Sequence, residues 1–143
     1  MNNLNVPNPK MMDVAVPANL KVGLAQADIA RRGWALNVAE AIKLVGRSDT
    51  ALIDLRENSE REKHGVIPGS LHAPYPDLQE NVSPGGMLHE LATATGKRII
   101  FYCAFGERSA MAVQAAQDSG IFSACHLEGG IGAWKKVNGP LLR

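Results

Sequence analysis

The sequence predicts an α/β fold in which helices cover both faces of a mainly parallel sheet. Short apolar runs rich in β-branched residues alternate with helix-like segments from residue 34 onward. A chain that returns to its sheet through a helix after each strand builds parallel neighbours, covered on both faces. At 143 residues, with no linker between two cores, the chain has the size of one domain.

The first residues differ in composition from the remainder. Residues 1–19 combine prolines with asparagines and show no periodicity, so we expect a disordered or loosely docked arm. Residues 20–32 have a weak apolar face and end at Gly33, which predicts an additional helix that packs partly or belongs to an interface. The predicted organisation is an arm with this extra helix over 1–33 and a folded domain over 34–143.

The domain is expected to begin with a short strand over 34–36. Asn37 and Glu40 then have the spacing of a capping box, in which each side chain binds the other residue's backbone N–H, and they predict a helix over 38–45. The apolar run over 51–55 predicts the next strand, which carries one acidic residue with a buried pattern.

Shorter elements occupy the middle of the domain. The charged stretch 57–64 predicts a surface turn of helix, and 70–73 predicts a short strand that ends before a proline. Residues 75–86 are rich in proline, glycine and asparagine and predict a loop. A modest helix is expected over 87–94, ended by a glycine.

The C-terminal part contains the clearest strand and helix. A β-branched and aromatic run predicts a buried strand over 98–102, and a helix follows over 109–118, closed by a glycine. A strand over 123–127 and a helix over 131–137, which an Asn-Gly-Pro stretch ends, complete the alternation.

The tight turn between strand 98–102 and helix 109–118 is the best candidate for a functional site. Cys103 begins it, and in open parallel sheets ligands bind beyond the carboxyl ends of the strands. Unpaired N–H groups and partial positive charge at a helix start stabilise an anion, so Cys103 should lose its proton more readily than a free thiol. Gly106 can turn its amide inward, and Arg108 adds a fixed positive charge.

These features predict a nucleophilic thiolate at Cys103, in preference to a buried structural thiol. Glu107 is expected to point toward solvent, because a carboxylate inside the loop opposes anion binding. Cys125 lies in the middle of a predicted strand and is interpreted as a core residue; the alternative is a resolving thiol that closes a disulfide after oxidation.

Asp54 ends an apolar strand, and a buried carboxylate must be paired or hydrogen-bonded. We expect it to satisfy backbone amides or to hold Arg56, in preference to transferring a proton. Arg108 either binds an anionic donor or bonds outward to a carboxylate such as Asp54, and the sequence does not distinguish the two. The four histidines have no metal-ligand spacing, so no metal site is predicted.

Several motifs, taken together and in order, resemble the rhodanese family of sulfurtransferases and cover the chain from about residue 34 to its C-terminal end. They are Leu52-Ile53-Asp54-Leu55-Arg56-Glu57, Ile67-Pro68-Gly69-Ser70 with His72-Ala73-Pro74, Cys103-Ala104-Phe105-Gly106-Glu107-Arg108-Ser109, and Leu127-Glu128-Gly129-Gly130 with Ala133-Trp134 and Gly139-Pro140.

The resemblance implies a parallel sheet of about five strands. It also implies that Cys103 takes a sulfane sulfur from thiosulfate or a persulfide donor, holds it as a persulfide, and passes it to a thiol, to cyanide or to a protein acceptor. No metal or organic cofactor is needed, because the enzyme itself carries the sulfur. Asp54 and Arg56 would support the site, and the amides expected to cradle the sulfur or the donor anion belong to Ala104, Phe105, Gly106, Glu107, Arg108 and Ser109.

Two other functions stay open. A Cys…Arg loop before a helix also holds the oxyanion in cysteine phosphatases and arsenate reductases, but only four residues separate Cys103 from Arg108, fewer than in the related phosphatases. The shorter ring should fit one sulfur atom better than a tetrahedral phosphate. The other alternative is a non-catalytic rhodanese-like module used for docking or redox sensing.

Composition narrows the range of partners. A formal net charge of +1 gives no reason to expect nucleic acid or a membrane surface as partner. The two cysteines are too few for a disulfide framework and lack the CxxC spacing of a zinc site. Neither a signal peptide nor an apolar run near the ~20 residues of a membrane span is found. We therefore expect a cytoplasmic enzyme; its oligomeric state is not predicted.

Overall fold

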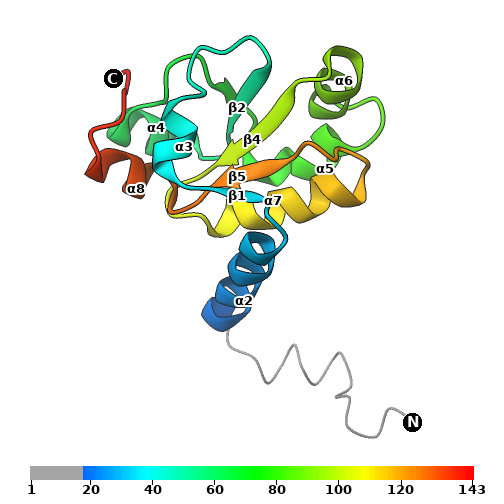
Figure 1. The fold of residues 1–143 in the computed structure, drawn as a ribbon, viewed down its shortest axis with the longest axis horizontal. Helices are drawn as coiled ribbons and strands as arrows, with labels where there is room; N and C mark the ends of the chain where they lie inside the picture. The colour runs from blue at the N-terminus through cyan, green and yellow to red at the C-terminus, as the bar shows by residue number, and fades with distance from the viewer. Residues whose placement is uncertain (1–17) are drawn as a thin grey trace, which may run out of the picture.

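The computed structural model describes residues 18–143, with side chains from residue 25 onward (Figure 1). Within this part, five strands form one parallel sheet in the order β1-β5-β4-β2-β3, which confirms the predicted fold class. The expected arm over 1–19 lies outside the described residues except for its last two. The strands are β1 (Ala35–Leu36), β2 (Thr50–Asp54), β3 (Leu71–His72), β4 (Arg98–Tyr102) and β5 (Cys125–Leu127).

The helices alternate with the strands as the sequence predicts, with shifts of a few residues at their ends. The predicted capping box is present: Asn37 Oδ1 accepts the Glu40 N–H at 2.9 Å, and Glu40 Oε1 accepts the Asn37 N–H at 3.0 Å. The described helices are α2 (Ala18–Arg31), α3 (Val38–Ile42), α4 (Asn58–His64), the 3-10 turn η1 (Tyr75–Asp77), α5 (Leu78–Val82), α6 (Met87–Thr95), α7 (Glu107–Asp118) and α8 (Gly130–Lys136).

The prediction of a loop over 75–86 is wrong for most of its length. Residues 75–82 form η1 and α5, and only the stretch after Val82 is irregular. Val82 is fully buried and Leu78 packs against the same core, so burial of these side chains stabilises a short helix whose local composition is unfavourable. Pro76 is compatible with it because the first turn of a helix does not need its N–H.

Two apolar layers cover the sheet. One contains Ile53 and Phe101 of the sheet with side chains from α2, α5, α6 and α7. The other contains Leu52 and Ile100 with side chains from α3 and α8, including the fully buried Trp134. Figure 1 shows these helices on both sides of the sheet, so the apolar runs of the central strands are buried on both faces.

The parallel register brings the ends of β2 and β4 together. Asp54 pairs with Tyr102, the last residue of each strand, and the Leu55 N–H donates to the Tyr102 carbonyl at 3.0 Å. The loops that follow these two strands therefore leave the same edge of the sheet, beside the start of α7. Of the helices in the described part of the chain, none is long and apolar enough to cross a membrane.

Candidate active site at the carboxyl edge of the sheet

Cys103 is the first residue after β4, at the predicted turn into α7. Its side chain is fully buried, and its Sγ accepts the backbone N–H of Gly106 at 3.1 Å. Gly106 has a φ of 108°, in the region that favours glycine, and precedes the first turn of α7. Among the described residues, the Gly106 N–H is the one backbone amide that donates a hydrogen bond to the sulfur.

A buried polar chain leads from Cys103 to a histidine. The thiol donates to Ser109 Oγ at 3.6 Å, and Ser109 Oγ lies 2.7 Å from Nδ1 of His126 on β5. The Ser109 hydroxyl also lies 3.2 Å from the Gly106 carbonyl. Burial lowers the pKa of His126 to about 4, so its ring is neutral at pH 7 and one ring nitrogen accepts a hydrogen bond. Sequence reasoning missed His126, because its partner stands 17 residues away on a different element.

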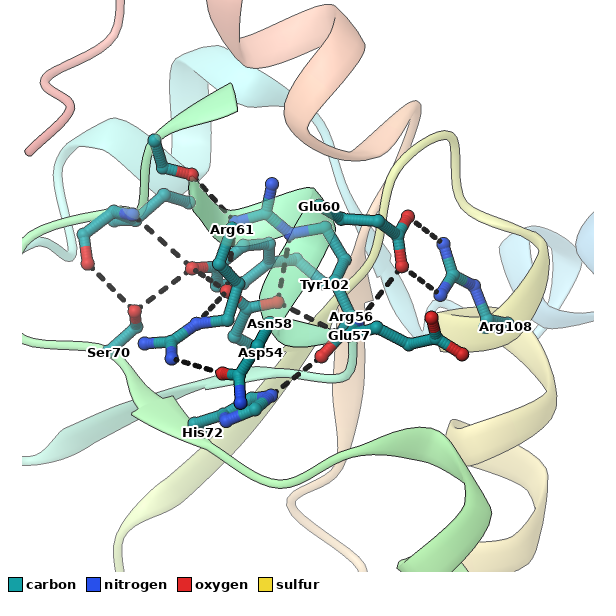
Figure 2. A network of polar contacts seen from close by, with 12 residues as sticks. Asp54, Arg56, Glu57, Asn58, Glu60, Arg61, Ser70, His72, Tyr102 and Arg108 are labelled. Atoms are coloured by element: carbon teal, nitrogen blue, oxygen red, sulfur yellow. Dashed lines mark hydrogen bonds and ion pairs between the residues drawn. The ribbon is translucent and has the colours of Figure 1, made fainter. Parts of the chain in front are cut away.

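Arg108 is bound to a carboxylate of α4. Its two terminal nitrogens donate to the two carboxylate oxygens of Glu60 at 2.8 Å each, as Figure 2 shows. These hydrogen bonds lower the pKa of Glu60 to about 2 and raise the pKa of Arg108 above its ordinary value. The carboxylate that binds Arg108 is therefore Glu60 and not Asp54, which the sequence suggested as an example. Glu60 also accepts the Glu57 N–H, a capping-type spacing that was visible in the sequence.

Asp54 is the centre of a buried network (Figure 2). Its Oδ1 accepts the backbone N–H and the Nε–H of Arg56 at 3.0 and 2.9 Å, so the structure contains the predicted Asp54–Arg56 contact. Its Oδ2 accepts Nη2 of Arg56, Nε of Arg61 and the hydroxyl of Tyr102, at 2.9, 3.2 and 3.0 Å. Two arginines thus share one carboxylate.

Tyr102 links this network to the turn before β3. Burial, and then the negative charge of Asp54, raise the pKa of Tyr102 to about 12, so the phenol stays protonated and can donate to Asp54. Its oxygen accepts the Ile67 N–H at 3.3 Å and lies 2.9 Å from Ser70 Oγ. From sequence, Tyr102 was only a residue of an apolar strand.

The start of α8 packs directly on the loop that follows Cys103. The Ile131 N–H donates to the Cys103 carbonyl at 2.9 Å, and the Gly132 N–H donates to the Ala104 carbonyl at 3.0 Å. A Cβ on Gly130 would lie 2.6 Å from the backbone of Ala104 and Cys103, a distance that no side chain tolerates. The double glycine of the C-terminal motif therefore permits this close approach, and α8 holds the loop in place.

A cavity of about 230 Å³ lies beside the loop. Phe105, which the sequence included among the site residues, lines it with a side chain that is 67% exposed, and its ring rests on Gly132. Cys103 itself does not line this cavity. The lining residues are Ala104 and Phe105 of the loop, Ile131, Gly132 and Lys135 of α8, and Arg56, Glu60 and His64 at α4.

The other predicted residues are placed as follows. Glu107 is half-buried at the start of α7 and makes no side-chain hydrogen bond to the described residues. Cys125 is buried in the apolar layer opposite to that of Cys103, and both are free thiols. Burial raises the pKa of the Cys125 thiol, in keeping with the core interpretation. Among residues 18–143, no group of three or more histidine, cysteine or acidic side chains could hold a metal ion.

Comparison with known proteins identifies the family that this architecture represents. The family model for the rhodanese-like domain matches residues 37–137. A protein from Synechocystis, slr1261, which is uncharacterized, is 37% identical over 90 residues, 58% of this chain and 50% of its own. The mouse thiosulfate sulfurtransferase/rhodanese-like domain-containing protein 3 is 31% identical over 100 residues, 66% of this chain and 64% of its own. The chain thus spans between half and two thirds of the length of these curated relatives.

Solved structures agree on the fold. A protein of unknown function from Rhodopseudomonas palustris, named as a possible tyrosine phosphatase, has a TM-score of 0.75 and 34% identity and covers 89% of this chain and 95% of its own. The human single-domain sulfurtransferase TSTD1 has a TM-score of 0.59 and 23% identity and covers 72% of this chain and 96% of its own. At 23% identity, the similarity to TSTD1 shows a shared fold alone.

Proposed function

Because the chain belongs to the rhodanese-like domain family, we propose that it is a sulfurtransferase that carries a sulfane sulfur on Cys103. The donor is thiosulfate or a related persulfide, and the acceptor is thiophilic. The observation that carries this proposal is the 3.1 Å hydrogen bond from the Gly106 N–H to the Cys103 sulfur at the start of α7. An N–H aimed at sulfur stabilises its charged form, as does the partial positive charge of a helix start.

The loading step balances without a cofactor. The Cys103 thiolate attacks the outer sulfur of thiosulfate, a new S–S bond forms on the enzyme, and the S–S bond of thiosulfate breaks. Sulfite leaves with the bonding electron pair, and the enzyme keeps a persulfide. The Gly106 N–H and the positive end of α7 are placed to stabilise negative charge at the sulfur before and after this step.

Burial of the thiol defines what the loop must do. Cys103 has no exposed surface, so a donor reaches the sulfur only when the loop or a side chain over it moves. Its sulfur nevertheless has two polar neighbours, Gly106 N and Ser109 Oγ, unlike a cysteine enclosed entirely by hydrocarbon. The docking or redox-sensing alternative predicts that the loop never opens to a small anion.

A phosphatase is the second candidate, because the Rhodopseudomonas palustris structure carries that suggestion in its name. Such an enzyme needs the loop arginine to bind the phosphate oxygens. Here both terminal nitrogens of Arg108 bind Glu60 bidentately, and freeing them would leave a half-buried carboxylate without its partner. The geometry therefore favours sulfur transfer over phosphate ester hydrolysis.

The test is incubation of the protein with thiosulfate, followed by intact mass spectrometry and a thiosulfate:cyanide assay. We expect the gain of one sulfur atom on wild type and none on Cys103→Ser, with Cys125→Ser as the matched control that still loads. A folded wild-type protein that gains no sulfur would overturn the proposal. Hydrolysis of an aryl phosphate well above the rate of Cys103→Ser would establish the phosphatase instead.

A further inference from the structure

His126 is a buried titratable residue to which the sulfur-loading step assigns no role. It lies on β5 with 2% of its surface exposed, and its Nδ1 is 2.7 Å from Oγ of Ser109. Ser109 belongs to the first turn of α7 and is fully buried, and its Oγ lies 3.6 Å from the Cys103 sulfur. A single hydroxyl group therefore separates the ring from the proposed nucleophile.

The Ser109 hydroxyl has one hydrogen and three polar neighbours. Besides the Cys103 sulfur and Nδ1 of His126, its oxygen lies 3.2 Å from the Gly106 carbonyl oxygen. That carbonyl already accepts the Ala110 N–H at 3.1 Å, so it does not depend on the hydroxyl for a hydrogen bond. The hydroxyl hydrogen is thus shared out chiefly between the sulfur and the ring.

The 2.7 Å contact between Ser109 and His126 needs a hydrogen, because two lone pairs at this distance repel each other. When Nδ1 carries no hydrogen, the Ser109 O–H donates to it, and the hydroxyl oxygen can only accept from the Cys103 thiol. When Nδ1 carries the hydrogen, it donates to the Ser109 oxygen, and the O–H is free to donate to the sulfur. The position of the ring hydrogen therefore decides which charge state of the sulfur the hydroxyl stabilises.

A neutral ring can adopt either arrangement. Burial lowers the pKa of His126 to about 4, and no charged side chain of the described residues contributes to this lowering. At pH 7 the ring therefore has one N–H, which either nitrogen can carry. The Cys103 sulfur has no hydrogen in a thiolate or in a persulfide, so in both states it can only accept. These states favour the arrangement in which Nδ1 carries the ring hydrogen.

We propose that His126 is a positioning residue for the reaction at Cys103. The Nδ1–H of its ring donates to Ser109 Oγ, and the Ser109 O–H then donates to the sulfur, as a second donor beside the Gly106 N–H. In this arrangement the ring hydrogen stays on Nδ1 and the hydroxyl hydrogen stays on Ser109, so no proton passes between residues. The inference rests on the proposed function, since it concerns how the same sulfur is stabilised.

The first measurement follows the ring hydrogen directly. Protein labelled with 15N in histidine and 13C in cysteine is titrated with base, while NMR records the two ring nitrogens of His126 and Cβ of Cys103. His126→Gln assigns the ring signals among the four histidines. We expect the His126 ring to change to the Nδ1–H form with the same pH midpoint as the ionisation of Cys103.

Two serine variants test whether the hydroxyl couples the ring to the sulfur. Ser109→Ala removes the hydroxyl, so the His126 signals should no longer change with the ionisation of Cys103. Ser123→Ala is the matched control and should keep the coupled change. The Ser123 hydroxyl binds the Lys97 carbonyl at 3.1 Å, before the amino ends of β5 and β4 and thus at the opposite edge of the sheet.

The second measurement is the pH profile of sulfur loading from thiosulfate, followed by quenched-flow mass spectrometry. Ser109→Ala should move the midpoint of the profile upward by about one pH unit, because the charged sulfur loses one of its two donors. Ser123→Ala should keep the wild-type midpoint. Glu107 and Arg108, the charged residues at the start of α7, are the same in both variants, so they cannot cause the difference.

Variants of the histidine separate positioning from space filling. His126→Leu fills the site without a donor, so the Ser109 hydroxyl is no longer directed to the sulfur, and the midpoint should again move upward. His126→Asn should restore the wild-type midpoint, because its amide N–H is the same number of bonds from Cβ as the Nδ1–H of the ring. A residue that only fills space would give the opposite order, since leucine suits an apolar core better than asparagine does.

Failure of this inference is distinguishable from failure of the proposed function. Wild type that gains sulfur, while the His126 ring keeps one form as Cys103 ionises, would overturn the positioning role and leave sulfur transfer standing. A midpoint for His126→Leu equal to that of wild type would do the same. Wild type that never gains sulfur would overturn the proposed function. The NMR titration needs neither a sulfur donor nor a folded variant, so it would still decide the role of His126.

Discussion

At the scale of single residues, hydrogen bonds hold a small polar cluster around Cys103 in otherwise apolar surroundings. The thiol has Ser109 Oγ as acceptor and the Gly106 N–H as donor, and Ser109 is in turn anchored by His126. Because the His126 ring is buried, it stays neutral, and its nitrogen fixes the position of the hydroxyl. Because this ring is neutral, it adds no positive charge beside the sulfur, whereas the start of α7 and Arg108 do.

The depressed pKa of His126 predicts a loss of stability in mild acid. A group whose pKa is lower in the folded state stabilises the fold above its unfolded pKa of 6.5 and loses that contribution as pH falls toward its folded pKa of about 4. The loss from His126 should reach about 2–3 kcal/mol near pH 4.5. Urea unfolding at pH 7 and pH 4.5 measures it. The fall in the free energy of unfolding between pH 7 and pH 4.5 should be smaller by this amount in His126→Gln, and the same as in wild type in His89→Gln. Equal falls in all three proteins would refute the prediction.

At the scale of elements, the site depends on how α8 docks on the loop between β4 and α7. Two backbone N–H groups at the start of α8 donate to the Cys103 and Ala104 carbonyls, so the peptide units beside the thiol cannot rotate freely. Arg108 and Glu60 in turn tie α7, at the end of the loop, to α4. The thiol loop is thus held by two helices that follow different strands of the sheet.

Substituting Gly130 should therefore lower the free energy of unfolding by more than its positive φ alone predicts. Gly130 and Gly96 have similar positive φ values, 60° and 71°, but only at Gly130 would a Cβ meet backbone atoms, at 2.6 Å. Gly96→Ala should lower the free energy of unfolding by about 1 kcal/mol, and Gly130→Ala by at least about twice as much. Urea denaturation with matched slopes measures both. Similar losses would mean that α8 can shift without resistance from the loop.

At the scale of the whole molecule, the Asp54 cluster connects segments that are far apart in sequence. Asp54 ends β2, Tyr102 ends β4, and Arg61 belongs to α4. The Arg56 guanidinium also donates to the Gly65 carbonyl, and its backbone carbonyl lies 2.6 Å from the ring of His72 on β3. One buried carboxylate therefore organises the edge of the sheet from which the candidate site is built.

Removing the charge of Asp54 should destabilise the entire domain. Asp54→Asn leaves Arg56 fully buried without a compensating carboxylate, a change that costs about 3–5 kcal/mol. Thermal and urea unfolding followed by circular dichroism should show a large fall in the midpoint or an unfolded protein at 37 °C. Asp49→Asn, which breaks an exposed pair with Arg47, is the control and should scarcely move the midpoint. A midpoint for Asp54→Asn equal to that of the control would contradict this role of the cluster.

Much of the fold and part of the site were predictable from local patterns. The strand over 98–102, the capping box of Asn37 and Glu40, and the glycine at the loop all act within a few residues, where periodicity and backbone preference decide the conformation. The helix over 78–82 was missed because its stability comes from burial of Val82 in a core assembled by other elements.

The sequence alone determined the α/β class and the location of Cys103 between a buried strand and a helix, because both follow from short-range patterns and chain alternation. Only the tertiary structure decided that Arg108 binds Glu60, that Ser109 contacts His126, and that Nη1 of Arg56 is buried without a partner among the described residues. Those contacts join residues from different strands and helices. Which residues meet depends on the order and register of the parallel sheet, and these cannot be read from the spacing of residues along the chain.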